Sequence, residues 1–452
     1  MRKAYIIMLA LLLTGLFSST YAAEAAVSPK LRIDGGLRQF SPGAQICNNR
    51  TMIPVRLVVE DEALQGQVYW DSQLRKVAID CKGKYIELFI GNNEARVDGE
   101  VKYLDAAPYV FQDRTYIPLR FFAENLGAIV GWDKERSEVL ISFNQKTRVF
   151  AYYYSRSFSE FKENVQLFTD VAYRWLATNA RGELSYEYRD SSNEALSLAR
   201  SLGLKNHASV VLMGQDPLHQ LLASSENRAR LIGNLLDEVK QNDYDGVNID
   251  FELMAASDAA NFTTFLRELK ASLGPDKDLS VAVFARTGKE KWATPYEYQK
   301  IGEIADWVVV MAYDYSYTNT APGPIAPLGW VKEVVAYMID NIPREKLLLG
   351  LPTYGYDWAD GLKTTSVTAS KLQALEQKYK VTEGFDYPSM SPYYNYVDSN
   401  GKYHQIWLEN ELSLNEKLNV AKSNQLGGIS FWRIGNGFDD LYQLLQKDQG
   451  GQ

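Results

Sequence analysis

Histidine and cysteine are both scarce in this sequence of 452 residues, and their scarcity limits the chemistry it can carry. The three histidines, His207, His219 and His404, are widely spaced, which argues against a zinc or copper site built on histidine. The two cysteines, Cys47 and Cys81, allow at most one disulfide, and a disulfide and two free thiols are equally compatible with the sequence. We therefore expect no metal centre and no cofactor.

The sequence also lacks an excess of positive charge and, beyond its first residues, any long apolar run. A net charge of −8 argues against nucleic acid as a partner, and no later segment could span a bilayer. The N-terminus has a basic start at Arg2 and Lys3, an apolar run from Ile6 to Phe17 and small residues up to Ala25. Residues 1–25 thus have the pattern of a secretory signal, and we expect an exported, monomeric protein.

A repeated pattern sets residues 30–146 apart from the rest of the chain. The segment RTMIPVR, Arg50 to Arg56, recurs as RTYIPLR, Arg114 to Arg120. A short helical stretch, a Trp-Asp pair (Trp70-Asp71 or Trp132-Asp133) and a β-like run follow each segment. The pattern predicts a small duplicated α+β domain in which two strand–helix–strand units bury their apolar faces together.

This duplicated pattern resembles the copper amine oxidase N-terminal-like domain, which is found on many secreted proteins of Gram-positive bacteria. The resemblance implies a role in attachment or spacing at the cell surface, or a purely structural role. Because residues 30–146 contain no histidine, we expect them to bind no copper.

Residues 147–452 show a different texture, in which short apolar runs alternate with amphipathic helical stretches. Such alternation is typical of βα units around a parallel sheet, and eight strands over about 300 residues predict an α/β fold, a (β/α)₈ TIM barrel. A turn-rich stretch after the seventh run predicts a small hairpin over the barrel mouth. The eight runs are RVFAYYY, DVAYRW, SVVLMG, DGVNIDFE, LSVAVFA, WVVVMAYDY, KLLLGLPTYGYDW and GGISFWRIG.

The fourth run, YDGVNIDFE, carries Asn248, Asp250 and Glu252 at alternate positions, so in a strand they share one face. In a barrel that face points into the lumen, and Glu252 lies at the carboxyl end of the strand, where barrel enzymes place their chemistry. A neighbouring carboxylate in a site of low dielectric constant raises the pKa of a carboxyl. We therefore predict Glu252 as the general acid and Asp250 as its partner.

The same run resembles the D-x-x-D-x-D-x-E signature of family 18 glycoside hydrolases, the chitinase-like enzymes, with Asn248 as the one departure. MAYDY resembles the motif of the sixth strand in that family, and SFWRIG that of the eighth. The resemblance implies that Tyr313 and Asp314 contact the acetamido group and the sugar, and that Trp432 forms the floor of the sugar subsite. It implies a mechanism in which the substrate's own acetamido oxygen is the nucleophile.

Other positions receive weaker assignments. Asn248 is expected to bind substrate, and Tyr354 and Trp175, near strand ends, are expected to form subsite walls. Asp245 and Gly246 are interpreted as a turn into the strand and Met311 as barrel core. These three are expected to be structural.

Within the family, several segments look like the spore cortex-lytic and related peptidoglycan hydrolases of Bacillus-type bacteria, a branch that tolerates asparagine in place of the second Asp of the signature. The partner is then a cell-wall or chitin-type glycan containing N-acetylglucosamine, and we expect a secreted protein associated with the cell wall or spore. A chitinase of the same mechanism and a wall-binding lectin with weak activity remain alternatives at this point.

Overall fold

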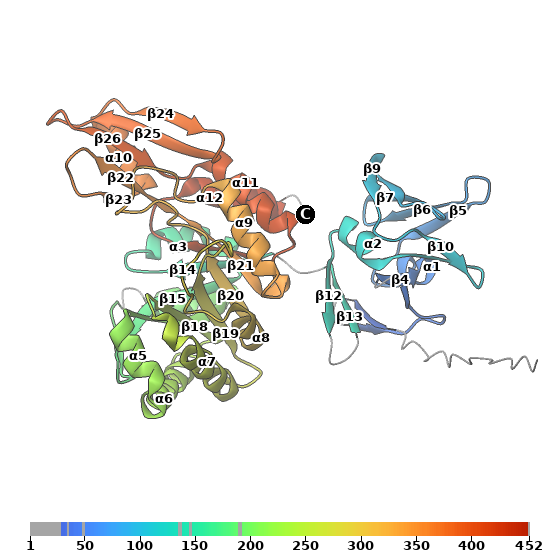
Figure 1. Ribbon diagram of the computed structural model, residues 1–452, viewed down its shortest axis with the longest axis horizontal. Helices are drawn as coiled ribbons and strands as arrows, with labels where there is room; N and C mark the ends of the chain where they lie inside the picture. The colour runs from blue at the N-terminus through green and yellow to red at the C-terminus, as the bar shows by residue number, and fades with distance from the viewer. Residues whose placement is uncertain are drawn as a thin grey trace, which may run out of the picture. The chain divides into compact units, whose positions relative to one another are not determined.

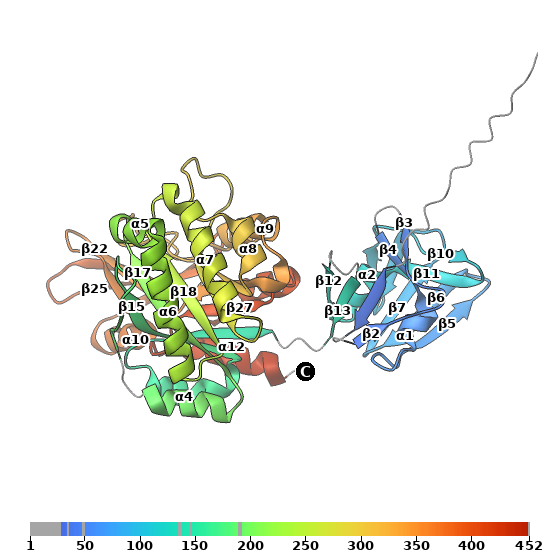
Figure 2. The same cartoon turned by 90° about the horizontal axis from the view of Figure 1, so that it is seen from below.

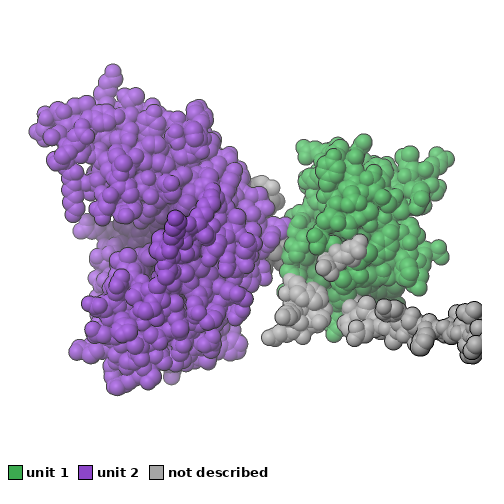
Figure 3. Space-filling model, in the orientation of Figure 1, with its two compact units in different colours: residues 1–144 green, residues 145–452 purple. Residues whose placement is uncertain are grey.

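The computed structural model describes residues 29–33, 36–47, 50–133, 138–143, 147–188 and 192–450. The predicted export signal, residues 1–25, lies outside these ranges. Contacts within the chain divide it into two compact units, residues 1–144 and 145–452 (Figure 3). None of the described helices is long and apolar enough to cross a bilayer.

The first unit consists mainly of short β-strands around one apolar core. Its strands are β1 (Lys30–Ile33), β2 (Gly36–Arg38), β3 (Gln45–Cys47), β4 (Arg50–Pro54), β5 (Gln67–Asp71), β6 (Lys76–Cys81), β7 (Lys84–Phe89), β8 (Glu94–Val97), β9 (Glu100–Tyr103), β10 (Tyr109–Phe111), β11 (Arg114–Pro118), β12 (Ile129–Asp133) and β13 (Glu138–Ser142). They form three sheets with the orders β12-β13-β1-β2, β10-β11-β4-β3 and β5-β6-β7-β8-β9. Two short helices, α1 (Val55–Val59) and α2 (Leu119–Asn125), complete the unit.

The duplication inferred from the sequence is present in the fold. In each copy a strand, β4 or β11, runs directly into a helix, α1 or α2, and then into a hairpin, β5–β6 or β12–β13. Trp70 and Trp132 each lie opposite a valine of their own hairpin, so the two hairpins share one register. Strands β4 and β11 pair antiparallel, with the buried residues Ile53 and Ile117 opposite each other. The two copies thus close a single core.

Both cysteines lie in this unit, and both are free thiols. Cys81, at the end of β6, is buried, and Cys47, on β3, is half-buried. Burial raises the pKa of the Cys81 thiol, which keeps it protonated and poorly reactive. Of the two alternatives that the sequence left open, the structure has the free thiols and not the disulfide.

The eight apolar runs predicted in the second unit form eight parallel strands of a closed barrel (Figure 1). These are β14 (Arg148–Tyr153), β15 (Asp170–Thr178), β17 (Lys205–Met213), β18 (Gly246–Glu252), β19 (Asp278–Phe284), β20 (Trp307–Met311), β21 (Leu347–Pro352) and β27 (Gly428–Trp432). Each strand pairs in parallel with the next, and β27 returns to β14. The predicted (β/α)₈ barrel is confirmed, with one antiparallel edge strand, β16 (Leu184–Tyr186), added beside β15.

Helices cover the outside of this barrel, and Figure 2 shows α5, α6 and α7 side by side across one face. The helices are α3 (Phe158–Asn164), α4 (Ser192–Ser201), α5 (Gln215–Ala223), α6 (Ser225–Gln241), α7 (Ala259–Leu273), α8 (Tyr298–Ile304), α9 (Leu328–Ile339), α11 (Glu411–Ser423) and α12 (Asp439–Gly450). Short 3₁₀ turns are η1 (Val165–Leu167), η2 (Ala256–Asp258) and η3 (Arg344–Lys346). The three apolar residues of β18 belong to the core beneath the helices, which leaves Asn248, Asp250 and Glu252 facing the lumen.

A second sheet follows the seventh barrel strand, where the sequence predicted only a small hairpin. It contains β22 (Tyr354–Ala359), β23 (Thr365–Thr368), β24 (Thr382–Asp386), β25 (Ser391–Val397) and β26 (Tyr403–Trp407), together with helix α10 (Ala369–Lys378). The strand order is β23-β22-β26-β25-β24, and Figure 1 shows the sheet as an orange lobe beside the barrel. The hairpin prediction was too small because the run KLLLGLPTYGYDW is two strands, β21 in the barrel and β22 in this sheet.

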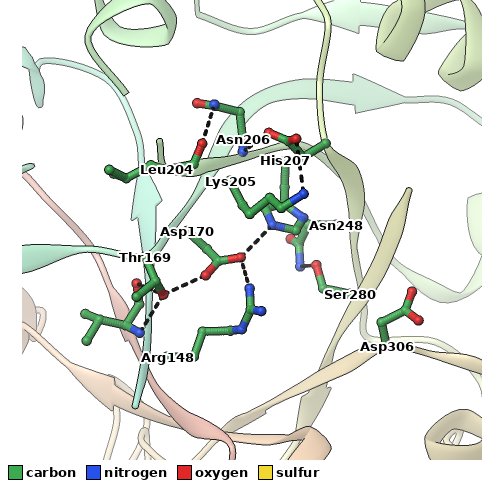
Figure 4. A network of polar contacts seen from close by, with 12 residues as sticks. Arg148, Thr169, Asp170, Leu204, Lys205, Asn206, His207, Asn248, Ser280 and Asp306 are labelled. Carbon is green, nitrogen blue, oxygen red and sulfur yellow. Dashed lines mark hydrogen bonds and ion pairs between the residues drawn. The ribbon is translucent and has the colours of Figure 1, made fainter. Parts of the chain in front are cut away.

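The floor of the barrel, at the amino ends of its strands, holds a buried polar network (Figure 4). Asp170 accepts a hydrogen bond from Thr169 Oγ1 at 2.6 Å, lies 3.0 Å from His207 Nε2 and forms an ion pair with Arg148. Asp170 and His207 have no solvent exposure. Burial would raise the pKa of Asp170, but the hydrogen bond and charge of His207 and the charge of Arg148 lower it below its ordinary value.

Asp278 lies close to this network, and its carboxylate, Asp170 and His207 place possible metal-ligand atoms within 4.8 Å of one another, the one such group found among the described residues. The guanidinium of Arg148 already pairs with Asp170, so a metal ion would sit beside a positive charge at close range. We therefore assign the cluster to the stability of the barrel floor, the usual role of that end of the fold.

Candidate active site

A pocket of about 220 Å³ opens at the carboxyl ends of the barrel strands, the end opposite the floor network. Its lining combines acidic side chains, one guanidinium and aromatic rings on a few apolar residues. The acidic residues are Asp250, Glu252 and Asp314, the cation is Arg174, and the aromatic residues are Tyr152, Phe284, Tyr313, Tyr354 and Trp432. The pocket therefore has the mixed apolar and polar character of a small-ligand site.

Asp250 and Glu252 project from the same face of β18 into this pocket. Glu252 is the last residue of the strand and is partly exposed, whereas Asp250 is buried. Two hydrogen bonds hold the backbone here: Tyr296 Oη donates to the carbonyl of Phe251 at 2.9 Å, and Gly214 N donates to the carbonyl of Glu252 at 3.0 Å. The structure thus brings the predicted pair together on a fixed strand end.

The surroundings of this pair separate the two carboxyls chemically. Burial raises the pKa of Glu252 to about 8, and the charge of Asp250 adds to the rise. Burial also raises the pKa of Asp250, to about 6, and the positive charge of Arg174 opposes that rise. At neutral pH Glu252 therefore keeps its proton while Asp250 is ionised, which is the arrangement that a general acid and an anionic partner require.

Arg174, on β15, is the cation of the pocket, and it was not among the residues predicted from the sequence. Its Nε lies 3.9 Å from Asp250 Oδ2, and its Nη1 donates to Glu187 Oε2 at 2.5 Å. The side chain is only 9% exposed, and Nε has no hydrogen-bond partner among the described residues. The positive charge of this buried guanidinium, so close to Asp250, favours the ionised form of that carboxyl.

Trp175, predicted as a subsite wall, lies instead in the core between the barrel and its helices, where it is 1% exposed. Its ring contacts Tyr173 and Tyr153, with centroids 4.5 Å and 5.5 Å away. The prediction failed because adjacent residues of a strand face opposite sides. The apolar residues Val171 and Tyr173 face the helices with Trp175, so the residue that faces the pocket is Arg174. That alternation was the signal by which the sequence could have identified Arg174.

Tyr313 and Asp314, predicted to contact the substrate, and Tyr354, predicted as a subsite wall, all line the pocket, and their contacts with substrate stay predictions. Asp314 accepts hydrogen bonds from Tyr354 Oη at 2.7 Å and from Tyr356 Oη at 3.0 Å. These bonds tie the loop after β20 to β22 of the second sheet. Burial raises the pKa of Tyr313 well above its ordinary value, so its hydroxyl keeps the proton that it needs as a hydrogen-bond donor.

Trp432, the last residue of β27, lines the pocket. Its ring is 5.4 Å from that of Tyr152 and 5.9 Å from that of Tyr154, measured between centroids. Thr353 fixes its backbone: Thr353 N donates to the carbonyl of Trp432 at 2.9 Å, and Arg433 N donates to Thr353 Oγ1 at 2.7 Å. The indole is therefore a rigid apolar surface on which a sugar ring could stack.

Asn248, predicted to bind substrate, does not reach the pocket. It is fully buried one layer below Asp250, where both ends of its amide are used. Ser209 Oγ donates to Asn248 Oδ1 at 2.9 Å, and Asn248 Nδ2 donates to Ser280 Oγ at 3.0 Å. Its role in the structure is to bridge β17, β18 and β19 inside the barrel.

The three residues interpreted as structural lie as follows. Asp245 accepts a hydrogen bond from Asn206 N at 2.9 Å, at the entry to the strand. At Gly246 a Cβ would come within 2.4 Å of a carbonyl oxygen of Asp278, so no larger residue fits without a shift. Met311 is buried at the end of β20, but it also lines the pocket, which the core assignment did not include.

Comparisons with known proteins agree with this geometry. The family described as Glycosyl hydrolases family 18 matches residues 148–437, and the Copper amine oxidase N-terminal domain matches residues 32–141. A cortical fragment-lytic enzyme of Bacillus anthracis is 32% identical over 233 residues, covering 50% of this chain and 54% of the relative. The chain thus spans about half the length of that curated relative.

Solved structures show the same fold. The spore cortex-lytic enzyme SleL of Bacillus cereus aligns with a TM-score of 0.61 and 25% identity, over 74% of this chain and 82% of the other. A chitinase from Chromobacterium violaceum aligns with a TM-score of 0.62 and 25% identity, over 67% of this chain and 99% of the other. With a family match over most of the chain and a carboxylate pair on the fourth strand of a closed barrel, the protein belongs to glycosyl hydrolase family 18.

Proposed function

We propose that this protein is an exported glycoside hydrolase that cleaves β-1,4 bonds at N-acetylglucosamine in peptidoglycan with retention of configuration. The observation that carries the proposal is the Asp250–Glu252 pair, in which a protonated carboxyl stands beside an ionised one in a pocket walled by tyrosine and tryptophan. The similarity to cortical fragment-lytic enzymes supports wall glycan as the substrate class.

In the proposed mechanism Glu252 gives its proton to the glycosidic oxygen as the bond to the anomeric carbon breaks. The acetamido oxygen of the same sugar attacks that carbon and forms a cyclic oxazolinium ion. Glu252, now ionised, removes a proton from water, and the water oxygen adds to the anomeric carbon and reopens the ring. The proton balance closes when the oxygen of the leaving sugar has become a hydroxyl and Glu252 is again protonated.

Other residues of the pocket stabilise this intermediate. Asp250 accepts a hydrogen bond from the acetamido N–H and offsets the positive charge of the oxazolinium, while Tyr313 donates to the acetamido oxygen. Trp432 stacks on the ring being cleaved. Because Asn248 carries no acidic proton and its amide is hydrogen-bonded to Ser209 and Ser280, we assign the control of the Asp250 charge to Arg174.

A digestion assay tests the substrate and the bond cleaved. Purified peptidoglycan is incubated with the protein, the new reducing ends are reduced with borohydride, and the terminal sugars are identified by mass spectrometry. We expect reduced N-acetylglucosamine as the new end, and none with Glu252→Gln. Reduced N-acetylmuramic acid would contradict the assignment.

Substrate assistance has its own test. Glycan with free amino groups in place of acetamido groups should resist cleavage, and a thiazoline mimic of the cyclic intermediate should inhibit strongly, as ligands that resemble the transition state do. Rapid cleavage of the deacetylated glycan would point to a nucleophile supplied by the protein.

Chitin oligomers are the second candidate substrate, because the chitinase from Chromobacterium violaceum aligns over 99% of its own length. The two substrates differ in the lactyl-peptide branch on alternate sugars of peptidoglycan. Relative kcat/KM on chitin tetramer and on a peptidoglycan fragment of equal length decides between them.

We also propose that residues 1–25 are removed on export and that residues 30–146 attach or space the catalytic unit at the cell surface. N-terminal sequencing of protein recovered from the culture medium or wall fraction tests the first point. A mature chain that still begins at Met1 would contradict it.

A further inference from the structure

The first unit contains a pocket of its own, formed where the two copies of its repeat meet. Its volume is about 310 Å³, in the range of small-ligand sites. The first copy supplies the start of α1 and the hairpin β5–β6, and the second copy supplies the turn between β10 and β11. The pocket exists because the duplication brings that turn over the helix of the other copy.

Trp70 supplies the largest apolar side chain of this pocket, beside smaller apolar residues that include Leu57 and Val110. On β5, Trp70 shares a face with Val68, and the register places it opposite Val77 of β6. Val68 and Val77 are buried at 8% and 1% exposure, whereas the tryptophan, on the same face, remains 47% exposed. Val110, which lines the same pocket, is 49% exposed, so the indole belongs to an exposed apolar surface and is not a single exposed side chain.

The polar part comes from the turn of the second copy and from α1. Asp113 has a left-handed backbone, with φ of +59°, and its neighbour Arg114 is exposed at the start of β11. Neither side chain has an ion-pair partner among the described residues. Arg56 is held in place by Glu60 Oε1 at 2.8 Å and by the carbonyl of Val68 at 3.1 Å. The pocket thus offers a carboxylate and two guanidinium groups around one indole.

We propose that this pocket binds a sugar of an N-acetylglucosamine-containing wall polysaccharide. A pyranose ring has an apolar face, which fits the indole of Trp70, and a rim of hydroxyl and acetamido groups, which fits the planar groups of Asp113, Arg114 and Arg56. The lining has one carboxylate and two guanidinium groups, but Arg56 is already paired with Glu60, so the charges left unpaired within the described part of the chain are those of Asp113 and Arg114, which offset each other. A small, concave site of this kind suits a polar neutral ring better than a polyanion or a flat protein surface. The choice of polysaccharide rests on the proposed function of the barrel.

Binding at this pocket would hold the catalytic unit on its insoluble substrate. A second site on the same polymer turns each later encounter of the barrel into an intramolecular one, which raises the effective substrate concentration. Loss of the pocket should therefore slow the hydrolysis of insoluble glycan and leave the turnover of soluble oligomers unchanged.

The test uses the full-length chain in a Glu252→Gln background, so that binding is measured without hydrolysis. The parent and the variants Trp70→Ala and Arg114→Gln are each sedimented with three insoluble glycans, and the bound fraction is measured. The glycans are peptidoglycan, peptidoglycan stripped of anionic polymers, and chitin. A parallel series that also carries Trp432→Ala removes the sugar-stacking ring of the barrel, so that the remaining binding belongs to the first unit. Tyr103→Ala on β9, which removes an aromatic side chain that is 78% exposed, is the matched control. Arg114 lies at an exposed turn, so its variant leaves the core intact.

We expect Trp70→Ala to weaken binding at least tenfold, as the loss of a central aromatic anchor does. Arg114→Gln should bind more weakly than the parent, and Tyr103→Ala should bind as tightly as the parent. If the Glu252→Gln parent binds chitin and stripped peptidoglycan, the glycan itself is the ligand of the pocket. If it binds only untreated walls, that assignment is overturned. Parent-like binding by both Trp70→Ala and Arg114→Gln overturns the pocket. If the active enzyme cleaves neither wall nor oligomer, the proposed function fails, while the sedimentation result still decides the pocket.

Discussion

The two ends of the barrel lumen both bury carboxylates beside an arginine, but they give them opposite properties. At the floor, Asp170 is bonded to Thr169, His207 and Arg148, and its pKa is lowered. At the mouth, the pair of Asp250 and Glu252 has raised pKa values. Burial opposes ionisation at both ends, so the difference comes from the number of partners each carboxylate has.

This difference separates a structural site from a chemical one. A carboxylate whose oxygens are all bonded has no capacity left for a substrate, and its partners make the ionised form permanent. Glu252, which lacks such a set of partners among the described residues, keeps its proton near neutral pH and can pass that proton on. The number of bonds to each acid therefore predicts which substitutions reduce activity and which reduce stability.

The largest expected effect is that of Glu252→Gln. The amide keeps the shape of the side chain but has no proton to donate, so kcat should fall by about 10² to 10⁴ while the melting temperature stays within a few degrees of the parent. Kinetics on a soluble oligomer and thermal denaturation measure the two quantities. Glu376→Gln, at an exposed position on α10, is the control and should leave kcat unchanged. Near-parental kcat in Glu252→Gln would remove this residue from the mechanism.

At the floor, Asp170→Asn should lower the free energy of unfolding and leave kcat nearly unchanged. Removing one partner of a buried ion pair leaves Arg148 and His207 uncompensated, at a cost of about 3 kcal/mol in the free energy of unfolding. Because the pKa of Asp170 is lower in the folded protein than in the unfolded chain, its stabilisation is present above the unfolded pKa and is lost as the pH falls through the folded pKa.

The difference in unfolding free energy between the parent and Asp170→Asn should therefore shrink as the solution is acidified. Urea denaturation at several pH values measures it, and kcat below the melting temperature should stay within about twofold of the parent. Asp237→Asn, exposed on α6, serves as the control. A large loss of kcat with unchanged stability would contradict the division between floor and mouth.

Sequence alone predicted the end of the lumen that carries chemistry better than it predicted the packing around it. The alternation along β18 indicated an inward polar face because period-two patterning is a local property of one strand. Trp175 was wrongly placed at the pocket, and Arg174 was missed, because the alternation of apolar residues along β15 was not used to assign the face of each residue. The second sheet was missed because the run KLLLGLPTYGYDW was taken as one strand across Pro352, the local sign of the point where the chain leaves the barrel. The bonding of Asn248 to two other strands is likewise a property of the closed ring.

A smaller effect is expected for Asp250→Asn, which should shift the pH profile of kcat/KM. Activity requires protonated Glu252, so kcat/KM is lost as the pH rises through the pKa of that residue, about 8. The charge of Asp250 contributes to that raised pKa, and its removal should move the basic limb to lower pH by about one unit. A profile of kcat/KM against pH measures the limb, alongside a fall in kcat from the loss of the acetamido acceptor. A limb that moves to higher pH would show that Asp250 does not act on Glu252 through its charge.

The smallest effect is that of Arg174→Gln on the same pH profile. The positive charge of Arg174 lowers the pKa of both carboxyls against the effect of burial, so its loss should raise both values. The acid limb, set by ionisation of Asp250, and the basic limb, set by Glu252, should then both move to higher pH by about half a unit to one unit. The basic limb thus moves in the direction opposite to its shift in Asp250→Asn. Arg174→Lys keeps the charge and should leave both limbs near their original positions. If Arg174→Lys moved the limbs as far as Arg174→Gln does, the role of Arg174 would lie in packing and in its bond with Glu187 instead.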